Sequence, residues 1–389
     1  MVDDLDQGRR PIRIGPGAGA ARALAACPGV HLEHPSRRPS DAVDRELFAE
    51  WGPVRRIWEG YAPDPGLRFR ASSGGLVTAL STFALQRGFA GVLHVGPDES
   101  EPWKNRTVLS QTKEEVESRC GSRYSPSSPG EGLGLIEAAD GPCVLVAKPC
   151  DVAGAQQARA LRPALDANLA LTIGIFCAGT PSLRGTLAML QVMGIDDPRT
   201  VTAVRYRGHG WPGRARADAI DTDGSARSAE LSYEESWGDI LQKHRQWRCM
   251  ICPDHTGEFA DISVGDPWYR PTGDDPGQSL VVARTEAGER FVLDAIASGA
   301  ITVVESAHRH LPASQPNLAT TRGQVWGRLI GMRLMNMPVP RYRNVPMFPS
   351  WWRRLSPREK LGSVAGTMRR VWQRKLYRRR PVQPRSPSG

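Results

Sequence analysis

The chain has 389 residues, of which 40% are hydrophobic, and a formal net charge of +10, so it is long enough for one large domain or two. The charge is uneven: residues 341–389 hold 14 Lys and Arg against one acidic residue, Glu359, and carry +13, which leaves about −3 on the rest. A near-neutral body argues against nucleic-acid binding, and no apolar run is long enough to span a bilayer.

The composition of the N-terminal part predicts little regular structure before about residue 50. Residues 1–50 are rich in Pro, Gly, Ala and Arg and predict a low-order lead-in, with structure beginning near Trp51. No signal-peptide pattern is present and the seven cysteines are widely spaced, so we expect a cytoplasmic protein with reduced thiols. Residues 72–88 predict a turn feeding a helix, and 89–95 predict a strand.

The middle of the chain alternates between strands and helices. Residues 143–147 and 169–177 are continuous apolar runs of the kind that is buried on both faces of a sheet, with a helix over about 152–161 between them. Alternating polarity around Asp223-Gly224 predicts an antiparallel hairpin within 215–231. We therefore predict an α/β fold whose mixed, largely parallel sheet is flanked by helices and carries a hairpin insertion.

The C-terminal part predicts a basic helical extension. We divide the chain into the lead-in 1–50, a core of 51–310 (made of 51–140 and 141–310), and the extension 311–389. A last helix should begin at Ser356-Pro357, with Glu359 at capping-box spacing, and the end of the chain should be disordered. Its apolar face predicts either contact of segment 351–380 with an anionic membrane or docking on protein. That face consists of Leu361, Val364, Met368, Val371 and Trp372.

Four cysteines form the strongest candidate site. Cys249 and Cys252 are a CxxC pair, while Cys150 and Cys177 each follow a buried strand. Ends of parallel strands meet at one edge of a sheet, so the four thiols should converge there. Four thiolates suit either zinc or an iron–sulfur cluster. Two isolated ligands plus one CxxC pair favour the cluster, because structural zinc usually draws its ligands from two local knuckles.

A second candidate site combines a glycine–serine turn with a polar loop. Glycines before a helix expose N–H groups that favour an anion, and hydroxyls nearby add donors. In the polar loop a guanidinium suits a phosphate and an aromatic ring suits a ring face. The predicted binding residues are Ser73, Gly74, Gly75, Thr78, Ser122, Arg123 and Tyr124. An ordinary capped helix and a surface loop are the alternatives.

Catalytic candidates are weaker. His209 in "RYRGHGWPG" could act as an acid, although a histidine in a turn is more often only solvated. Asp266 follows a short predicted strand and could accept hydrogen bonds from a ligand. Arg123 is the third candidate, because a guanidinium can position an anionic group.

The motifs together resemble a known family. "SSGGLVTAL", "GSRYSP", "PCDVAG", "FCAGTPS", "GHGWPG" and "RCMICPDHTGEFADISVGDPW" occur in this order over about 55–310. They resemble the coenzyme F420 hydrogenase/dehydrogenase beta subunit family. The resemblance implies FAD, a [4Fe–4S] cluster on Cys150, Cys177, Cys249 and Cys252, and coenzyme F420 as a candidate co-substrate.

The chain also departs from that pattern. Many members of that family carry an N-terminal ferredoxin-like module, and here only Cys27-Pro28-Gly29 resembles its last turn. Lys148 and Asp151 stand where relatives commonly have a small residue and Gln. The implied function is electron transfer between a hydride carrier or organic substrate, FAD and the cluster, with ferredoxin or another oxidoreductase subunit as partner. The alternatives are a ferredoxin-dependent reductase in biosynthesis, for example of a surface polysaccharide, and a non-catalytic zinc scaffold.

Overall fold

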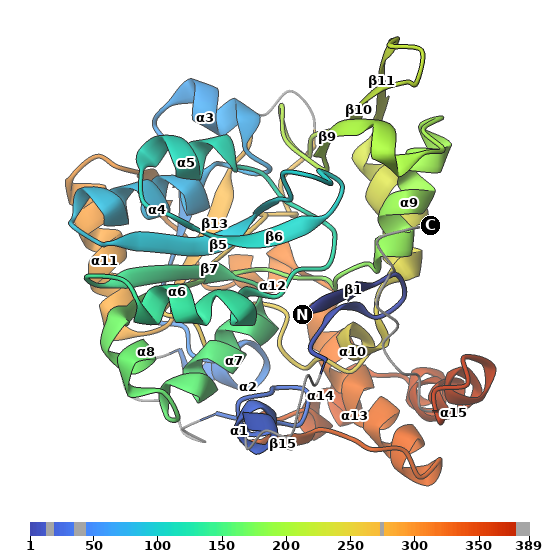
Figure 1. Ribbon diagram of the computed structural model, residues 1–389. Coiled ribbons are helices and arrows are strands. Elements are labelled where there is room, and N and C mark those ends of the chain that lie inside the picture. Colours follow the sequence, from blue (N-terminus) through green and yellow to red (C-terminus); the bar gives the residue numbers. More distant parts are fainter. Residues whose placement is uncertain (13–18, 35–43, 273–275, 379–389) are drawn as a thin grey trace.

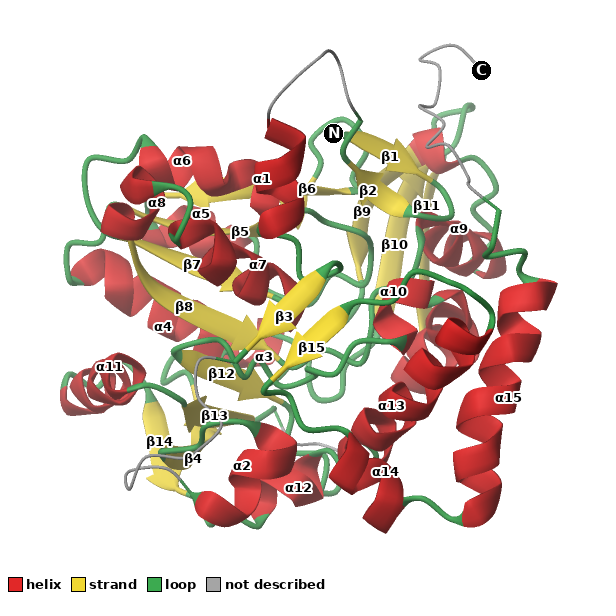
Figure 2. Cartoon of the chain, turned by 90° about the horizontal axis from the view of Figure 1, so that it is seen from below, coloured by secondary structure: helices red, strands yellow, loops and turns green. Residues whose placement is uncertain are grey.

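The computed structural model describes residues 1–12, 19–34, 44–272 and 276–378 (Figure 1). Within them, a mixed sheet of eight strands forms the centre of the core (Figures 1 and 2). Its order is β14 (Thr302–Glu305), β4 (Arg56–Tyr61), β13 (Ser279–Ala283), β12 (Ile262–Gly265), β8 (Leu169–Ile175), β7 (Cys143–Ala147), β5 (Gly91–Pro97) and β6 (Asn105–Ser110). Strands β12, β8, β7 and β5 form a central parallel block, and antiparallel strands flank it on both sides. The predicted α/β class is confirmed.

Helices cover both faces of the sheet, which is why its central strands are apolar on both sides. One face carries α4 (Leu76–Gln86), α5 (Lys113–Ser118) and α11 (Glu286–Ala297), and α3 (Pro65–Arg70) lies nearby. The other face carries α6 (Leu133–Glu137), α7 (Pro149–Arg159) and α8 (Pro163–Asn168). Leu76, Leu80 and Phe83, spaced by three or four residues, turn one side of α4 into the core.

A smaller antiparallel sheet projects from the core, as the hairpin signal predicts (Figure 1). It consists of β9 (Val201–Arg205), β10 (Ala215–Ile220) and β11 (Ala226–Leu231), and it packs with α9 (Leu183–Val192). Gly224 has φ +85° at the hairpin turn, which glycine adopts without steric cost. Irregular helical turns over Glu234–Ile240 and Leu241–His244 then lead to α10 (Trp247–Met250), which contains Cys249.

The prediction of little order over 1–50 is wrong for the described residues of that segment. They form β1 (Val2–Asp4), β2 (Gly8–Arg10), α1 (Gly19–Ala25), β3 (His31–Glu33) and α2 (Arg45–Trp51). Their short lengths explain why no periodicity marks them in the sequence. Strand β3 pairs in parallel with β15 (Arg341–Arg343), so the lead-in and the C-terminal extension lie side by side at these strands. The rest of the lead-in, 13–18 and 35–43, lies outside the described residues.

The C-terminal extension is helical, as predicted. It contains α12 (His310–Ser314), α13 (Leu318–Leu334), α14 (Phe348–Arg354) and α15 (Pro357–Gln373). The capping box of Ser356 and Glu359 is present. The predicted apolar face of α15 is divided in its surroundings, since Val371 is buried against α13 whereas Leu361 and Trp372 are 70% and 68% exposed. None of the helices described is long and apolar enough to cross a membrane. The predicted disordered end falls mostly outside the described residues.

Candidate functional site

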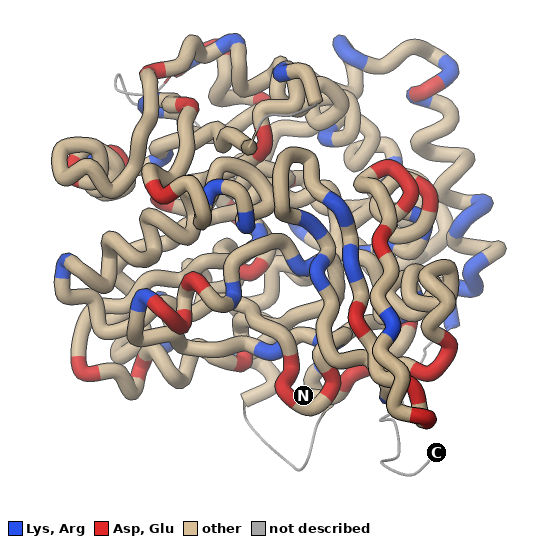
Figure 3. Tube along the Cα trace, turned by 90° about the horizontal axis from the view of Figure 1, so that it is seen from above, with Lys and Arg blue, Asp and Glu red and all other residues tan. Residues whose placement is uncertain are grey.

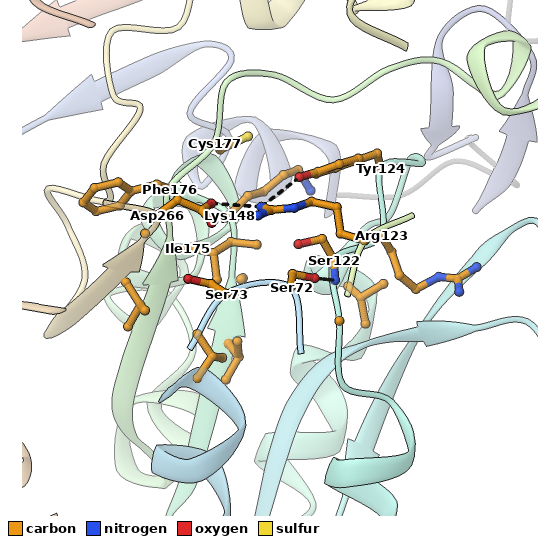
Figure 4. A pocket seen from close by; sticks show the side chains of 18 of the residues that line it. Ser72, Ser73, Ser122, Arg123, Tyr124, Lys148, Ile175, Phe176, Cys177 and Asp266 are labelled. Atoms are coloured by element: carbon orange, nitrogen blue, oxygen red, sulfur yellow. Dashed lines mark hydrogen bonds and ion pairs between the residues drawn. The ribbon is translucent and has the colours of Figure 1, made fainter. Parts of the chain in front are cut away.

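A first cavity, the strand-end pocket, lies at the carboxyl ends of the parallel strands β7, β8 and β12 (Figure 4). This edge is where open α/β sheets place ligands. The pocket has a volume of about 290 Å³. Its lining includes Ser72, Ser73, Gly75, Thr78, Ser122, Tyr124, Arg207, Tyr233, Trp237, Asp266 and Trp268. Both stretches predicted to bind an anion therefore meet in one place.

The glycine–serine turn opens the N-terminus of α4 onto the strand-end pocket. Gly75 precedes the helix with φ +75°, and the Ser72 hydroxyl accepts a hydrogen bond from the Ser122 N–H at 2.5 Å. Gly74 does not line the pocket. A Cβ atom at this residue would lie 2.5 Å from the Gly60 carbonyl, and its N–H donates to Ser279. The prediction of Gly74 as a binding residue is therefore corrected: this glycine allows close packing of the turn on β4.

An ion pair closes one wall of the strand-end pocket. Arg207 is 2% exposed and donates two hydrogen bonds to Asp266, at 2.8 and 2.9 Å. Asp266 also accepts from the Trp211 indole at 2.8 Å. The guanidinium lies over the rings of Tyr233 and Trp268, 5.1 and 5.5 Å from their centroids. Asp266 thus reaches the pocket as predicted, but its oxygens hold Arg207 and Trp211 in place.

Arg123 and Tyr124, which are neighbours in sequence, behave differently. The Arg123 guanidinium donates to Asn105 and to the carbonyls of Pro102, Lys104 and Val204. Figure 4 shows it turned away from Ser73 and Asp266. Arg123 lines the strand-end pocket, but its donors are taken by the fold, which argues against the predicted roles as a phosphate ligand and a catalytic group. Tyr124 lines the pocket, and its hydroxyl accepts a hydrogen bond from Arg207 at 3.4 Å.

His209 is placed outside both cavities. It is an exposed residue of the loop before β10, with φ +60°, and its ring lies 5.4 Å from that of Phe69. The prediction of His209 as an acid at the site is wrong. The "RYRGHGWPG" motif instead contributes Arg207 and Trp211, which both bind Asp266. The sequence does not reveal this contact, because several arginines could pair with that carboxylate.

A second and larger cavity, the thiol cavity, has a volume of about 790 Å³. Its lining includes Cys27, Cys150, Cys177, Cys249 and Cys252. Cys150 lies in the first turn of α7, and Cys177 follows β8 by two residues. The thiols of Cys150 and Cys177 are each close enough to Cys252 for their charges to interact. The four predicted ligands, scattered over 103 positions of the sequence, are thus brought together.

The chemistry of these thiols suits a bound metal group, either a zinc ion or a cluster. In the part of the chain that the structure describes, no three His, Cys, Asp or Glu side chains are placed to share one metal ion. Four cysteine thiolates can hold a tetrahedral zinc ion at about 2.3 Å, and four can also hold a [4Fe–4S] cluster. Burial raises the pKa of Cys177 to about 12 and of Cys252 to about 11. Arg248 is the nearest compensating charge for Cys252.

The two cavities share a wall. It consists of Ser127, Lys148, Asp151, Cys177, Gly179, Thr180 and His255. Lys148 pairs with Asp151; burial alone would lower the pKa of Lys148, but Asp151 and the neighbouring thiols raise it. His255 is 7% exposed and its Nδ1 lies 2.8 Å from the Cys177 carbonyl, while its Nε2 has no hydrogen-bond partner. The positions of Lys148 and His255 in this wall cannot be predicted from the sequence, because they depend on which residues line both cavities.

Comparisons with known proteins agree with this architecture. The model for the N-terminal region of the coenzyme F420 hydrogenase/dehydrogenase beta subunit matches residues 57–133, and the model for its C terminus matches 142–308. Coenzyme F420 hydrogenase subunit beta from Methanothermobacter thermautotrophicus is 25% identical over 256 residues, which is 64% of this chain and 83% of that protein. F420-dependent formate dehydrogenase 1 subunit beta from Methanococcus maripaludis is 22% identical over 61% of this chain and 58% of its own.

A solved structure shares the fold. A chain of the F420-reducing [NiFe] hydrogenase complex from Methanosarcina barkeri superposes with a TM-score of 0.55 at 21% identity, over 72% of this chain and 94% of that one. The two family models together match more than half of the chain, in a region that includes the four predicted cluster cysteines. The chain therefore belongs to the coenzyme F420 hydrogenase/dehydrogenase beta subunit family and is an oxidoreductase.

Proposed function

We propose that the chain is an iron–sulfur flavoprotein, with FAD at the strand-end pocket and a [4Fe–4S] cluster held by Cys150, Cys177, Cys249 and Cys252 in the thiol cavity. The observation that carries the proposal is the shared wall, in which Cys177 lines both cavities. A flavin exchanges hydride with an organic donor and single electrons with a cluster, so the two groups are useful only as neighbours. One layer of side chains separates these two cavities.

The residues of the strand-end pocket suit a flavin. Its volume is smaller than whole FAD, so we assign it to the ring system and the nearest phosphate, with the adenosine part beyond it. The N-terminus of α4, with Ser72 and Thr78, would hold the phosphate. Tyr124, together with the rings around Arg207, would fix the plane of the flavin, because aromatic side chains stack on ring faces.

Lys148 supplies positive charge to the wall between the cavities. It stays protonated beside Asp151, so it would stabilise negative charge that develops on either side. His255 offers its unpartnered Nε2 to the same wall, where it can hydrogen-bond a bound group. The protein's part in the reaction is thus orientation of both groups and compensation of their charge.

The proposed hydride donor or acceptor is coenzyme F420 or another organic substrate, since the curated relatives are named for F420. The one-electron partner is ferredoxin or another oxidoreductase subunit, reached from the thiol cavity. A ferredoxin-dependent biosynthetic reductase is the alternative within the same chemistry. A non-catalytic scaffold with zinc on the same four cysteines is the second alternative, and the metal and flavin content of the purified protein separates it from the proposed enzyme.

Anaerobic purification tests the proposal directly. The protein should contain FAD and about four iron and four sulfide per chain, and one of reduced F420, nicotinamide or reduced ferredoxin should bleach the flavin. Cys252→Ser should lose most of the iron. Cys143→Ala, in buried strand β7 and outside both cavities, is the matched control and should keep it. Protein without iron, or with iron that survives Cys252→Ser, would rule the assignment out.

We also propose that the outer face of α14 and α15 contacts an anionic membrane surface. Trp352, Leu361 and Trp372 are 61–70% exposed there, and Figure 3 shows Lys and Arg along the C-terminal helices at the right-hand edge. Exposed Trp and Leu beside basic residues are typical of helices that lie in a membrane interface, where each Lys or Arg adds about 1 kcal/mol of attraction to anionic lipid.

Vesicle flotation tests the membrane contact. Wild type should float with vesicles containing anionic lipid and remain below with zwitterionic ones, because charge contributes most of the attraction. The triple variant Trp352→Ser, Leu361→Ser, Trp372→Ser should bind at least tenfold more weakly. Val192→Ser, a 62% exposed residue on α9, is the control. Equal flotation of wild type and the triple variant would eliminate this contact.

A further inference from the structure

The C-terminal extension lies outside both family matches, yet it contacts the loop that carries Cys249 and Cys252. We propose that this extension is part of the cluster site, and that Arg328, Tyr342 and the core around Ile251 position the CxxC loop and tune the cluster's reduction potential. The inference rests on the proposed [4Fe–4S] cluster and assigns a role to residues beyond 308.

The first anchor is a side chain between the two cysteines. Ile251 is 4% exposed and belongs to a hydrophobic core supplied almost entirely by the extension. Its partners there are Val325, Leu329 and Met332 of α13, Met347 before α14, and Val371 of α15. The cysteine loop is therefore fixed by the apolar core of the extension, because burial of the isoleucine side chain is favourable.

The second anchor is a pair of backbone carbonyls in the same loop. Arg328 of α13 donates a hydrogen bond to the Met250 carbonyl at 2.5 Å, and Tyr342 of β15 donates to the Ile251 carbonyl at 2.8 Å. Buried carbonyls without a partner are costly, so these two bonds select one loop conformation. That conformation decides where the Cys249 and Cys252 sulfurs point.

Tyr342 also controls a charge beside the thiols. Its hydroxyl accepts a hydrogen bond from Arg248 at 3.2 Å, and Arg248 also donates to the Pro28 carbonyl at 2.7 Å. The same hydroxyl donates to the Ile251 carbonyl, so one group joins Arg248 to the cysteine loop. Arg248 is thereby held next to the cysteines, where positive charge favours the more negative, reduced state of a cluster.

The extension is rigid enough to act as a support. Gly327 and Gly331 on α13 let α15 approach closely: a Cβ atom at Gly327 would lie 1.9 Å from the Ser363 hydroxyl, and one at Gly331 would lie 2.7 Å from the Val364 carbonyl. On the opposite side, Arg322 of α13 forms an ion pair with Glu258, behind the cysteine loop, with both side chains 3% exposed. Helix α13 is thus fixed between α15 and the loop.

Tyr342→Phe is the sharpest test, because it removes one hydroxyl and keeps the ring. On the anaerobically purified protein we expect a lower cluster potential, by about tenfold in the ratio of oxidised to reduced cluster, which is 59 mV for one electron. We also expect an altered EPR signal and several-fold faster loss of iron to a chelator. Tyr377→Phe is the control, since that tyrosine belongs to the extension but is 49% exposed.

Arg328→Gln and Arg328→Lys complete the test. Arg328→Gln should accelerate the loss of iron to a chelator. Arg328→Lys can still donate to the Met250 carbonyl, so it should lose iron at a rate closer to that of wild type. Wild type without iron and sulfide would defeat the proposed cluster itself. Wild type with a cluster, and variants that match it in potential, EPR signal and chelation rate, would overturn this inference alone. If Tyr342→Phe does not fold, the comparison of Arg328→Gln with Arg328→Lys decides.

Discussion

The strand-end pocket and the thiol cavity differ in which parts of the chain build them. The pocket is lined almost entirely by residues between 71 and 279, at the ends of parallel strands. The thiol cavity draws on residues within 1–11 and 19–29, on the core and on a loop held by the extension. A pocket at strand ends follows from the sheet alone, whereas the second cavity needs both ends of the chain. Its integrity should therefore depend on contacts far from the sulfurs.

The largest expected effect comes from separating the extension from the core. Arg322→Met leaves the Glu258 carboxylate buried without its partner, which should lower the free energy of unfolding by about 3–5 kcal/mol. Urea denaturation of the metal-free protein measures this loss. The double variant Glu258→Gln, Arg322→Met should recover part of it, because no uncompensated charge remains. A loss below about 1 kcal/mol for Arg322→Met would mean that the extension is only loosely attached.

A smaller effect is expected on the pocket side. Asp266→Asn weakens two hydrogen bonds to the buried Arg207 guanidinium and should cost about 2–3 kcal/mol. Flavin content should fall while the iron content stays at the wild-type level. Asp221→Asn, which breaks the exposed pair with Arg227, is the matched control and should change stability by less than about 1 kcal/mol. Equal loss of flavin and iron in Asp266→Asn would show that the cavities are not separable.

The same difference explains what the sequence could predict. Strands β7 and β8 can be predicted from the sequence, because continuous apolar runs indicate strands buried on both faces. The convergence of Cys150 and Cys177 follows from the parallel pairing of these strands. The contacts of Arg123 and Gly74 cannot be predicted from the sequence, because they involve neighbours distant in sequence, Val204 for the first and Gly60 for the second. No local pattern records such a contact.

The thiol cavity shows more clearly which contacts cannot be predicted from the sequence. The CxxC motif is visible in the sequence, but its support is not, because Tyr342 lies 90 residues further on. The short strand that carries Tyr342 pairs with β3 of the lead-in, a segment that composition alone predicts to have little order. The composition of a segment indicates whether that segment can fold by itself. Strands β3 and β15 instead stabilise each other by pairing, which composition does not record.

The smallest expected effect is a pH dependence of stability that comes from His94 in the strand-end pocket. His94 of β5 is 9% exposed, lines the strand-end pocket and lies 2.8 Å from the Ser110 hydroxyl. Burial, with Arg119 nearby, lowers the pKa of His94 to about 4. Between pH 6.5 and 4 the unfolded chain binds a proton there and the folded chain does not. Stability should therefore fall as the pH falls, by about 2 kcal/mol at pH 5 from this group.

His94→Gln should remove this contribution, since glutamine can hydrogen-bond Ser110 but does not titrate. Burial raises the pKa of Asp254 in the thiol cavity to about 6, so that group acts with the opposite sign: its contribution grows on acidification. It is the same in both proteins, so the wild-type loss between pH 7 and pH 5 minus the variant's loss isolates His94. Urea denaturation at the two pH values measures the difference, and a value near zero would mean that His94 is protonated in the folded protein.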